Sequence, residues 1–143
     1  MARKILFPTD GSPAAKAAGR FARDIAKGEG DSLLVLVVAA PAAYGSVEDK
    51  AVTEGIASYM RQVAEDEATE LSASGVEASF EVVESLEIHE AIVAKAQEAE
   101  ADMMVMGTHG HTGFRRAVIG SIADKVVRYS DVPVVLVPLK SGE

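Results

Sequence analysis

The feature that most constrains this fold is a repeated alternation between short apolar runs and segments with helical spacing. Four helical segments separate five apolar runs, which lie at residues 4–8, 32–38, 77–83, 103–106 and 134–137. Residues 32–38 (SLLVLVV) are almost all leucine and valine, as expected of a parallel strand covered on both faces. Strands that alternate with helices require right-handed crossovers. The sequence therefore predicts one α/β domain over residues 1–143, with a doubly wound five-stranded parallel sheet and helices on both faces.

The ends of the predicted helices follow from capping residues and from glycines. Ser12 and Pro13 are typical of an N-cap and a first helical residue, and this helix is expected to run to about Lys27 and to be ended by Gly28 and Gly30. Ser121 is expected to cap the last helix, with Asp124 as a capping-box-like partner. The apolar face of the first helix is predicted to contain Ala14, Ala17, Ala18, Phe21, Ala22 and Ile25.

The second predicted helix carries an apolar stripe and a group of acidic residues. Gly75 closes this helix, and the stripe comprises Ile56, Tyr59, Met60, Val63, Ala64, Ala68 and Leu71. We interpret the carboxylates as a solvated face rather than a catalytic pair; they are Glu65, Asp66, Glu67 and Glu70. The run after this helix, residues 77–83, alternates polar and apolar positions, which predicts an edge strand.

Polar or glycine-rich turns follow two of the predicted strands. The first strand ends in Thr9, Asp10 and Gly11, and the fourth is followed by Gly107, Gly110, Gly113 and Gly120. Glycines between a strand and a helix allow an anion to approach backbone N–H groups, so we expect a phosphate site. If the first and fourth strands are neighbours, the strand order is 3-2-1-4-5 and the two turns face one crevice at its switch point.

Composition restricts the partners of this site. The formal charge of −8 argues against a nucleic-acid backbone or an anionic membrane as the main partner, because both require a basic face. No apolar run approaches the roughly 20 residues that span a bilayer. The chain has no cysteine, which excludes disulfides and thiolate zinc sites and fits the cytoplasm, where we expect the protein to act.

Two common phosphate motifs do not match. A P-loop needs Gly-Lys directly before Ser or Thr, where this chain has Ile119 and Gly120 before Ser121. The dinucleotide fingerprint needs three spaced glycines after the first strand, where this chain has Thr9-Asp10-Gly11. The glycine-rich segment therefore requires a different interpretation.

The spacing resembles the nucleotide-binding branch of the universal stress protein family. The family signature is Gly-x-x-Gly, nine residues, then Gly with Ser or Thr; here Gly107-Thr108-His109-Gly110 precedes nine residues and Gly120-Ser121. The resemblance extends from the first strand, ending Pro8-Thr9-Asp10-Gly11-Ser12, to the closing run Pro133-Val134-Val135-Leu136-Val137. It departs from the family before the third helix, where Leu86 and Ile88 stand in place of a frequent glycine and proline.

The resemblance implies an ATP site and assigns its residues. Adenine and ribose would be contacted by Pro8, Thr9 and Asp10, with Val38 against the base and with Met106 and Gly107 beside the adenosine. The triphosphate would lie on backbone N–H groups and hydroxyls of His109, Gly110, Gly120, Ser121 and Ile122. Mg²⁺ would be held largely by the phosphate oxygens.

Each assigned residue also has a structural interpretation. Asp10 alone would form an Asx-turn, the glycines would serve loop geometry, and Ser121 would only cap a helix. His109 and His111, with His89 as the third histidine, lack the ligands of a closed zinc site, and Arg115 and Arg116 are weak phosphate candidates.

The resemblance implies a nucleotide-dependent stress-response or signalling module. The alternatives are a slow ATPase or phosphotransfer enzyme, for which few catalytic groups are present, and a nucleotide-independent assembly protein. A phosphoacceptor receiver domain would need an aspartate after the third strand, where Glu84 and Ser85 stand. Prolines flank the last strand, which suits an edge, and relatives commonly dimerise through it, so we expect a homodimer through Val134–Val137.

Overall fold

Strands and helices alternate through the described part of the chain. The computed structural model describes residues 2–40, 50–109 and 119–139. The elements in order are β1 (Lys4–Pro8), α1 (Pro13–Glu29), β2 (Ser32–Ala39), α2 (Lys50–Ala73), β3 (Glu77–Glu84), α3 (Ile88–Glu98), β4 (Met103–Gly107), α4 (Ser121–Tyr129) and β5 (Val134–Val137).

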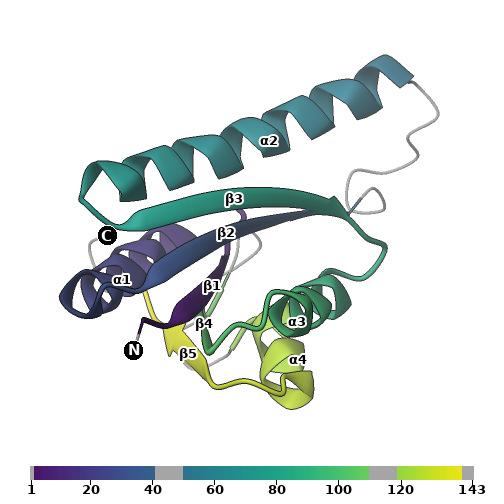
Figure 1. Cartoon of the computed structure of the whole chain (residues 1–143). Coiled ribbons are helices and arrows are strands. Elements are labelled where there is room, and N and C mark those ends of the chain that lie inside the picture. Colours follow the sequence, from purple (N-terminus) through teal and green to yellow (C-terminus); the bar gives the residue numbers. More distant parts are fainter. Residues whose placement is uncertain (1, 41–49, 110–118, 140–143) are drawn as a thin grey trace.

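The five strands form one parallel sheet in the order β3-β2-β1-β4-β5 (Figure 1). β1 lies at the centre, where Leu6 is paired with Leu34 of β2 and with Met104 of β4. The predicted α/β class, strand order and edge position of β3 are confirmed. The chain winds outward from β1 in both directions, so the switch point lies between β1 and β4.

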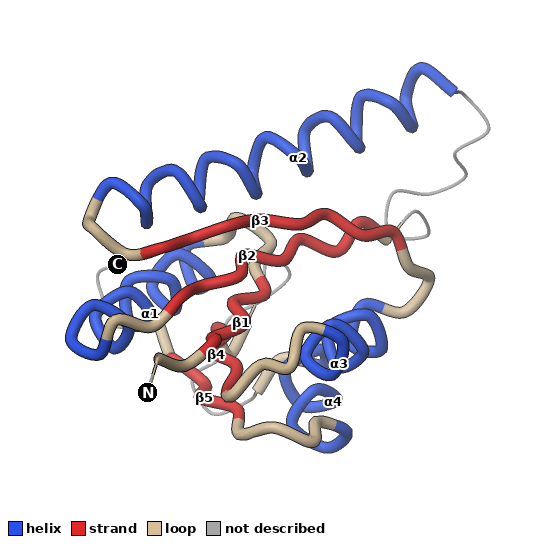
Figure 2. The backbone as a smooth tube through the Cα atoms, viewed as in Figure 1, coloured by secondary structure: helices blue, strands red, loops and turns tan. Residues whose placement is uncertain are grey.

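Helices cover both faces of the sheet, as predicted (Figure 2). Ile5 and Phe7 of β1 pack with the α1 and α2 face, in a cluster that includes Ala18 and Ala68. Leu6 points to the opposite face and packs with residues of α3 and α4 such as Ile92 and Val126. Alternate residues of the same strand thus fill two cores, which explains why β1 has almost no polar position.

Small residues bring α1 close to the sheet. A Cβ at Gly19 would lie 2.9 Å from Cζ of Phe7, so the helix could not approach this closely with a larger residue there. The predicted role of Gly30 in ending α1 is confirmed, because Gly30 is the C-cap in the left-handed conformation, with φ of 72°, although the helix continues through Glu29, two residues beyond the predicted Lys27. Phe21, predicted on the buried face, is 44% exposed.

The predicted start of the last helix was wrong by one residue. Gly120 is the N-cap of α4 and Ser121 is its first helical residue, with no side-chain capping hydrogen bond. The Asp124 carboxylate pairs with Arg128 one turn later, at 3.0 Å, instead of forming a capping box. At the start of α1, by contrast, the predicted cap is confirmed, because Ser12 Oγ accepts the Ala15 N–H at 3.2 Å.

The interpretation of the α2 carboxylates as a solvated face was wrong for Glu67. Its side chain is buried, with 6% of the residue exposed, whereas Glu65, Asp66 and Glu70 are exposed. Tyr59, predicted in the apolar stripe, is 61% exposed. The buried stripe of α2 therefore contains one carboxylate.

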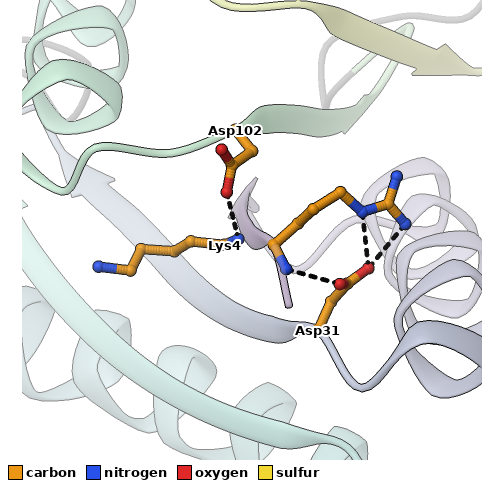
Figure 3. Close-up of polar contacts among 4 residues, drawn as sticks. Lys4, Asp31 and Asp102 are labelled. Carbon is orange, nitrogen blue, oxygen red and sulfur yellow. Dashed lines mark hydrogen bonds and ion pairs between the residues drawn. The ribbon is translucent and has the colours of Figure 1, made fainter. Parts of the chain in front are cut away.

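Two aspartates fasten β1 at the amino end of the sheet (Figure 3). Asp31, just before β2, accepts the backbone N–H of Arg3 at 2.7 Å and the guanidinium Nη2 of Arg3 at 2.7 Å. Asp102, just before β4, accepts the Lys4 N–H at 2.8 Å, and its own N–H donates to the Lys4 carbonyl. Both neighbours of β1 thus hold it from the end opposite the switch point.

Candidate functional site

The candidate site lies at the carboxyl ends of β1 and β4, where the strand order reverses. In open parallel sheets this is where ligands bind, because adjacent crossovers leave in opposite directions and open a crevice. β1 and β4 are paired neighbours, so the turns after them lie at the same sheet edge. This brings together the two sequence segments, about a hundred residues apart, that the sequence predicts to share one site.

The turn after β1, residues 9–12, is held by its own side chains. The Gly11 N–H donates to Thr9 Oγ1 at 3.1 Å, and the Ser12 N–H donates to Asp10 Oδ1 at 2.9 Å. Gly11 has φ of 79°, a conformation that disfavours residues with a Cβ. Asp10 thus forms the Asx-turn that was the structural alternative, and its side chain remains exposed at the sheet edge.

Thr9 is buried and its hydroxyl is directed towards α2. Thr9 Oγ1 donates to Glu67 Oε1 at 2.8 Å, and the Thr9 N–H donates to the Leu36 carbonyl of β2. Burial raises the pKa of Glu67 above its ordinary value, and the hydrogen bond from Thr9 and the charge of Lys16 partly offset this rise. The side chain of Thr9 is therefore occupied in fixing the turn.

Glycine at the end of β4 is required by packing. A Cβ at Gly107 would lie 3.0 Å from both the carbonyl carbon and the oxygen of Ala14, in the first turn of α1. Neither contact can move easily, because both atoms belong to the backbone. Gly107 thus allows the end of β4 to lie directly against the start of α1, beside the β1 turn.

Gly120 makes a similar close contact. Its N–H donates to the Thr108 carbonyl at 2.7 Å, and a Cβ there would lie 2.9 Å from that same oxygen. This contact joins the residues after β4 to the start of α4. Ser121 and Ile122, the first two residues of α4, have exposed side chains. The first N–H groups of a helix have no partner within the helix and carry positive partial charge.

The remaining predicted residues line the same edge. Pro8 and Met106 are buried at the ends of their strands, and Val38 is half-buried against the core under α3 and α4. His109 is half-buried, with Nδ1 2.9 Å from Thr108 Oγ1. Gly110, like Gly113, His111 and the two arginines Arg115 and Arg116, lies outside the described residues. In the described ranges, no group of three or more His, Asp or Glu side chains is arranged to hold a metal ion.

Glu67 and Val63, one helical turn apart on α2, support the turn and were not predicted as site residues from the sequence. A Cβ at Gly11 would lie 3.1 Å from Val63 Cγ1, so Val63 packs directly under the turn. The spacing of the buried α2 residues contained the signal. Met60, Ala64, Glu67 and Leu71 follow one another at intervals of four, three and four, which places Glu67 on the apolar face.

This arrangement can bind an anionic ligand with an apolar part. The α4 N-terminus offers backbone N–H groups to an anion, Asp10 offers an exposed carboxylate to hydroxyls or amines, and Val38 offers an apolar surface. The polar groups are presented by turns whose backbone is fixed by hydrogen bonds and by close packing. No helix in the described parts of the chain has the length and apolarity that a bilayer crossing needs.

Comparisons with known proteins agree with this fold. The universal stress protein family model matches residues 1–138. Universal stress protein MJ0531 of Methanocaldococcus jannaschii is 29% identical over 139 residues, which cover 94% of this chain and 81% of that protein. The structure of MJ0577 from the same organism superposes with a TM-score of 0.80 at 28% identity, over 99% of each chain.

A third similarity concerns the fold alone. The universal stress protein of Archaeoglobus fulgidus, solved in complex with dAMP, has a TM-score of 0.71 at 21% identity and covers 96% of this chain and 98% of that one. The family model matches 138 of the 143 residues, and the fold is shared with the structure of MJ0577. The chain therefore belongs to the universal stress protein family.

Proposed function

We propose that this protein is an ATP-binding module that changes its shape or its partners with nucleotide occupancy in a stress response. The observation that supports this most is the pairing of β1 with β4, which places the exposed Asp10 turn at the same end of the sheet as the N-terminus of α4, held there by the hydrogen bond from Gly120 to Thr108. One offers a carboxylate to ribose hydroxyls, and the other offers backbone N–H groups to phosphates. An A. fulgidus member of the family has been solved with an adenine nucleotide, dAMP.

The proposed pose distributes the ligand between the two turns. Adenine and ribose lie against Pro8, Thr9, Asp10 and Val38, with Met106 and Gly107 beside them. The phosphates lie on His109, Gly110, Ser121 and Ile122 and beside Gly120, whose own N–H donates to the Thr108 carbonyl. The exposed Ser121 hydroxyl and the first N–H groups of α4 suit this role, because Gly120 caps the helix without a side-chain hydrogen bond. Mg²⁺ would take most of its ligands from the phosphate oxygens.

The proposal is for binding rather than efficient hydrolysis. Asp10 Oδ1 accepts the Ser12 N–H, an interaction that fixes the turn. A turn-forming carboxylate suits recognition of a ribose better than proton transfer to water. We propose the cytoplasm as the compartment, consistent with a chain that has no cysteine.

Release of bound nucleotide tests the proposal directly. The purified protein is denatured, and any released small molecule is identified by chromatography and mass spectrometry. We expect ATP or a related adenine nucleotide, or binding of added ATP with Mg²⁺ by protein that carries none. Absence of both would rule out the proposed function and favour a nucleotide-independent assembly protein.

We further propose a homodimer through β5. This strand forms one edge of the sheet, and its four residues are all half-buried. Val135 and Val137 pack against one core and Val134 and Leu136 against the other, so its open edge is flanked by apolar side chains. Sedimentation should show a dimer at roughly tens of micromolar, a working range for specific association. A monomer throughout that range would contradict the proposal.

A further inference from the structure

The turn after β1 is supported from outside the sheet by two α2 side chains one helical turn apart. Glu67 Oε1 accepts the Thr9 hydroxyl at 2.8 Å, and Val63 lies 3.1 Å from the position of a Cβ at Gly11. Residues four apart on a helix lie on one face, so α2 contacts the turn at both points from the same side. The turn is thus clamped between β1 and α2.

The partner of Glu67 distinguishes it from other buried charged groups in the described residues. Asp31 is paired with the Arg3 guanidinium, and Lys95 lies 3.0 Å from Glu81 and 3.1 Å from Glu98. Glu67 instead receives a hydrogen bond from a neutral hydroxyl. Burying an ionised carboxylate whose hydrogen-bond donor is a neutral hydroxyl costs folding free energy. Burial raises the pKa of Glu67 for the same reason, because it disfavours the charged form. A role in core packing alone would be filled better by leucine or methionine.

The Thr9 hydroxyl links Glu67 to the backbone of the turn at Gly11, and a separate hydrogen bond closes the turn at Asp10. Thr9 Oγ1 donates to Glu67 and accepts the Gly11 N–H, and Asp10 Oδ1 accepts the Ser12 N–H in the same turn. Because the Thr9 hydroxyl donates its hydrogen bond to Glu67, its lone pairs are left facing the Gly11 N–H. The direction of the Thr9 hydroxyl therefore fixes the backbone from which the Asp10 carboxylate projects.

We propose that Glu67 is a positioning residue for the nucleotide site. Through its hydrogen bond with the Thr9 hydroxyl, Glu67 holds the Asp10 turn in the conformation that binds the ligand. This inference rests on the proposed ATP site. It makes α2 part of the support of that site, because Glu67 contacts Thr9 and Val63 lies against Gly11. Glu67 touches no ligand in this scheme and acts only through the turn.

Glu67→Met and Glu67→Gln test this role. Methionine fills similar space but offers no strong acceptor, whereas glutamine keeps a carbonyl oxygen for the Thr9 hydroxyl. Glu70→Met is the matched control, because Glu70 lies on the same helix with an exposed side chain. The first measurement is amide hydrogen exchange of Gly11 and Ser12 in nucleotide-free protein, and the second is the Kd for ATP with Mg²⁺.

We expect Glu67→Met to speed amide exchange at Gly11 and to weaken ATP binding by about tenfold. This factor corresponds to the loss of one hydrogen bond to a carboxylate, here the bond that Thr9 donates to Glu67. Glu67→Gln should keep the exchange rate and the Kd within about twofold of wild type, because the glutamine carbonyl still accepts the Thr9 hydrogen bond. Glu70→Met should leave both values unchanged, because Glu70 makes no hydrogen bond to the turn in this scheme. Wild-type exchange and affinity in Glu67→Met, or a Glu67→Gln protein as weak as Glu67→Met, would overturn the inference. If wild-type protein binds no ATP, the proposed function fails first, and this inference fails with it.

Discussion

Among single residues, two glycines of the signature, Gly107 and Gly120, are needed for close packing as well as having a proposed binding role. Gly107 lies against the backbone of Ala14, and Gly120 lies against the carbonyl of Thr108. Both contacts belong to the protein itself and exist without a ligand. The spaced glycine pattern is therefore also the pattern that lets β4, α1 and α4 meet at one point.

A Gly107→Ala substitution should destabilise the protein by about 1–3 kcal/mol, the usual range for overpacking, because its Cβ would press on the Ala14 backbone. Gly28→Ala is the control. Gly28 is helical with no atom within 4 Å of an added Cβ, so alanine there should stabilise by roughly 0.5–1 kcal/mol. Urea unfolding measures both values. A neutral Gly107→Ala would show that α1 can move away from β4.

At the scale of elements, the two helices that begin at this sheet edge do so differently. α1 is capped by the buried Ser12 hydroxyl, whereas α4 begins after Gly120 with no side-chain cap. The N-terminus of α1 is thus satisfied within the protein, and that of α4 is the one that suits a ligand.

Ser12→Ala should therefore cost about 1 kcal/mol of folding stability, the typical value for loss of an N-cap, because the Ala15 N–H loses its acceptor. Ser121→Ala should leave stability within about 0.5 kcal/mol, as for other exposed positions, and should weaken ATP binding instead. Thermal unfolding and ATP titration of the two variants separate the roles. Equal loss of stability in both would mean that Ser121 also caps α4.

Strands with uniform burial were the simplest elements to predict from the sequence. The apolar runs of β1, β2 and β4 are buried on both faces, so their pattern needed no knowledge of neighbours, and the strand order followed from the two turns. The exact cap of α4 could not be predicted, because Gly120 and Ser121 are both acceptable N-cap residues and only the contact of Gly120 with Thr108 selects between them.

The burial of Glu67 was missed for a different physical reason. Acidic residues on helices usually face solvent, and the neighbouring Glu65, Asp66 and Glu70 do so. The burial of one carboxylate depends on Thr9, which lies 58 positions earlier in the chain. The spacing of α2 places Glu67 on the apolar face, but its partner Thr9 can be identified only from the fold, which brings α2 over the end of β1.

In the whole molecule, the two ends of β1 differ in role: one end is held by structural hydrogen bonds, and the other end forms part of the candidate site. The amino end is fixed by Asp31 and Asp102, whereas the carboxyl end carries the candidate site. Hydrogen bonds hold the central strand at its amino end, and the candidate site is built at its carboxyl end from the segments after β1 and β4.

This division makes a pH prediction. The hydrogen bond from Arg3 lowers the pKa of Asp31 below its ordinary value of about 3.9, so ionised Asp31 stabilises the fold above that value. The contribution is lost as the pH falls through the lowered pKa. Asp31→Asn should be less stable than wild type at neutral pH, and the difference should shrink below about pH 4. A difference independent of pH in urea unfolding would contradict this account of Asp31.

Backbone amide NMR shifts, recorded as ATP and Mg²⁺ are added to nucleotide-free protein, show whether the nucleotide binds between β1 and β4. We expect the changes to gather at Thr9, Asp10, Gly107, Ser121 and Ile122, while the shifts of Lys4, Asp31 and Asp102 at the opposite end of the sheet stay unchanged. Saturating ATP without any shift, or shifts gathered at that opposite end, would contradict a nucleotide site between β1 and β4.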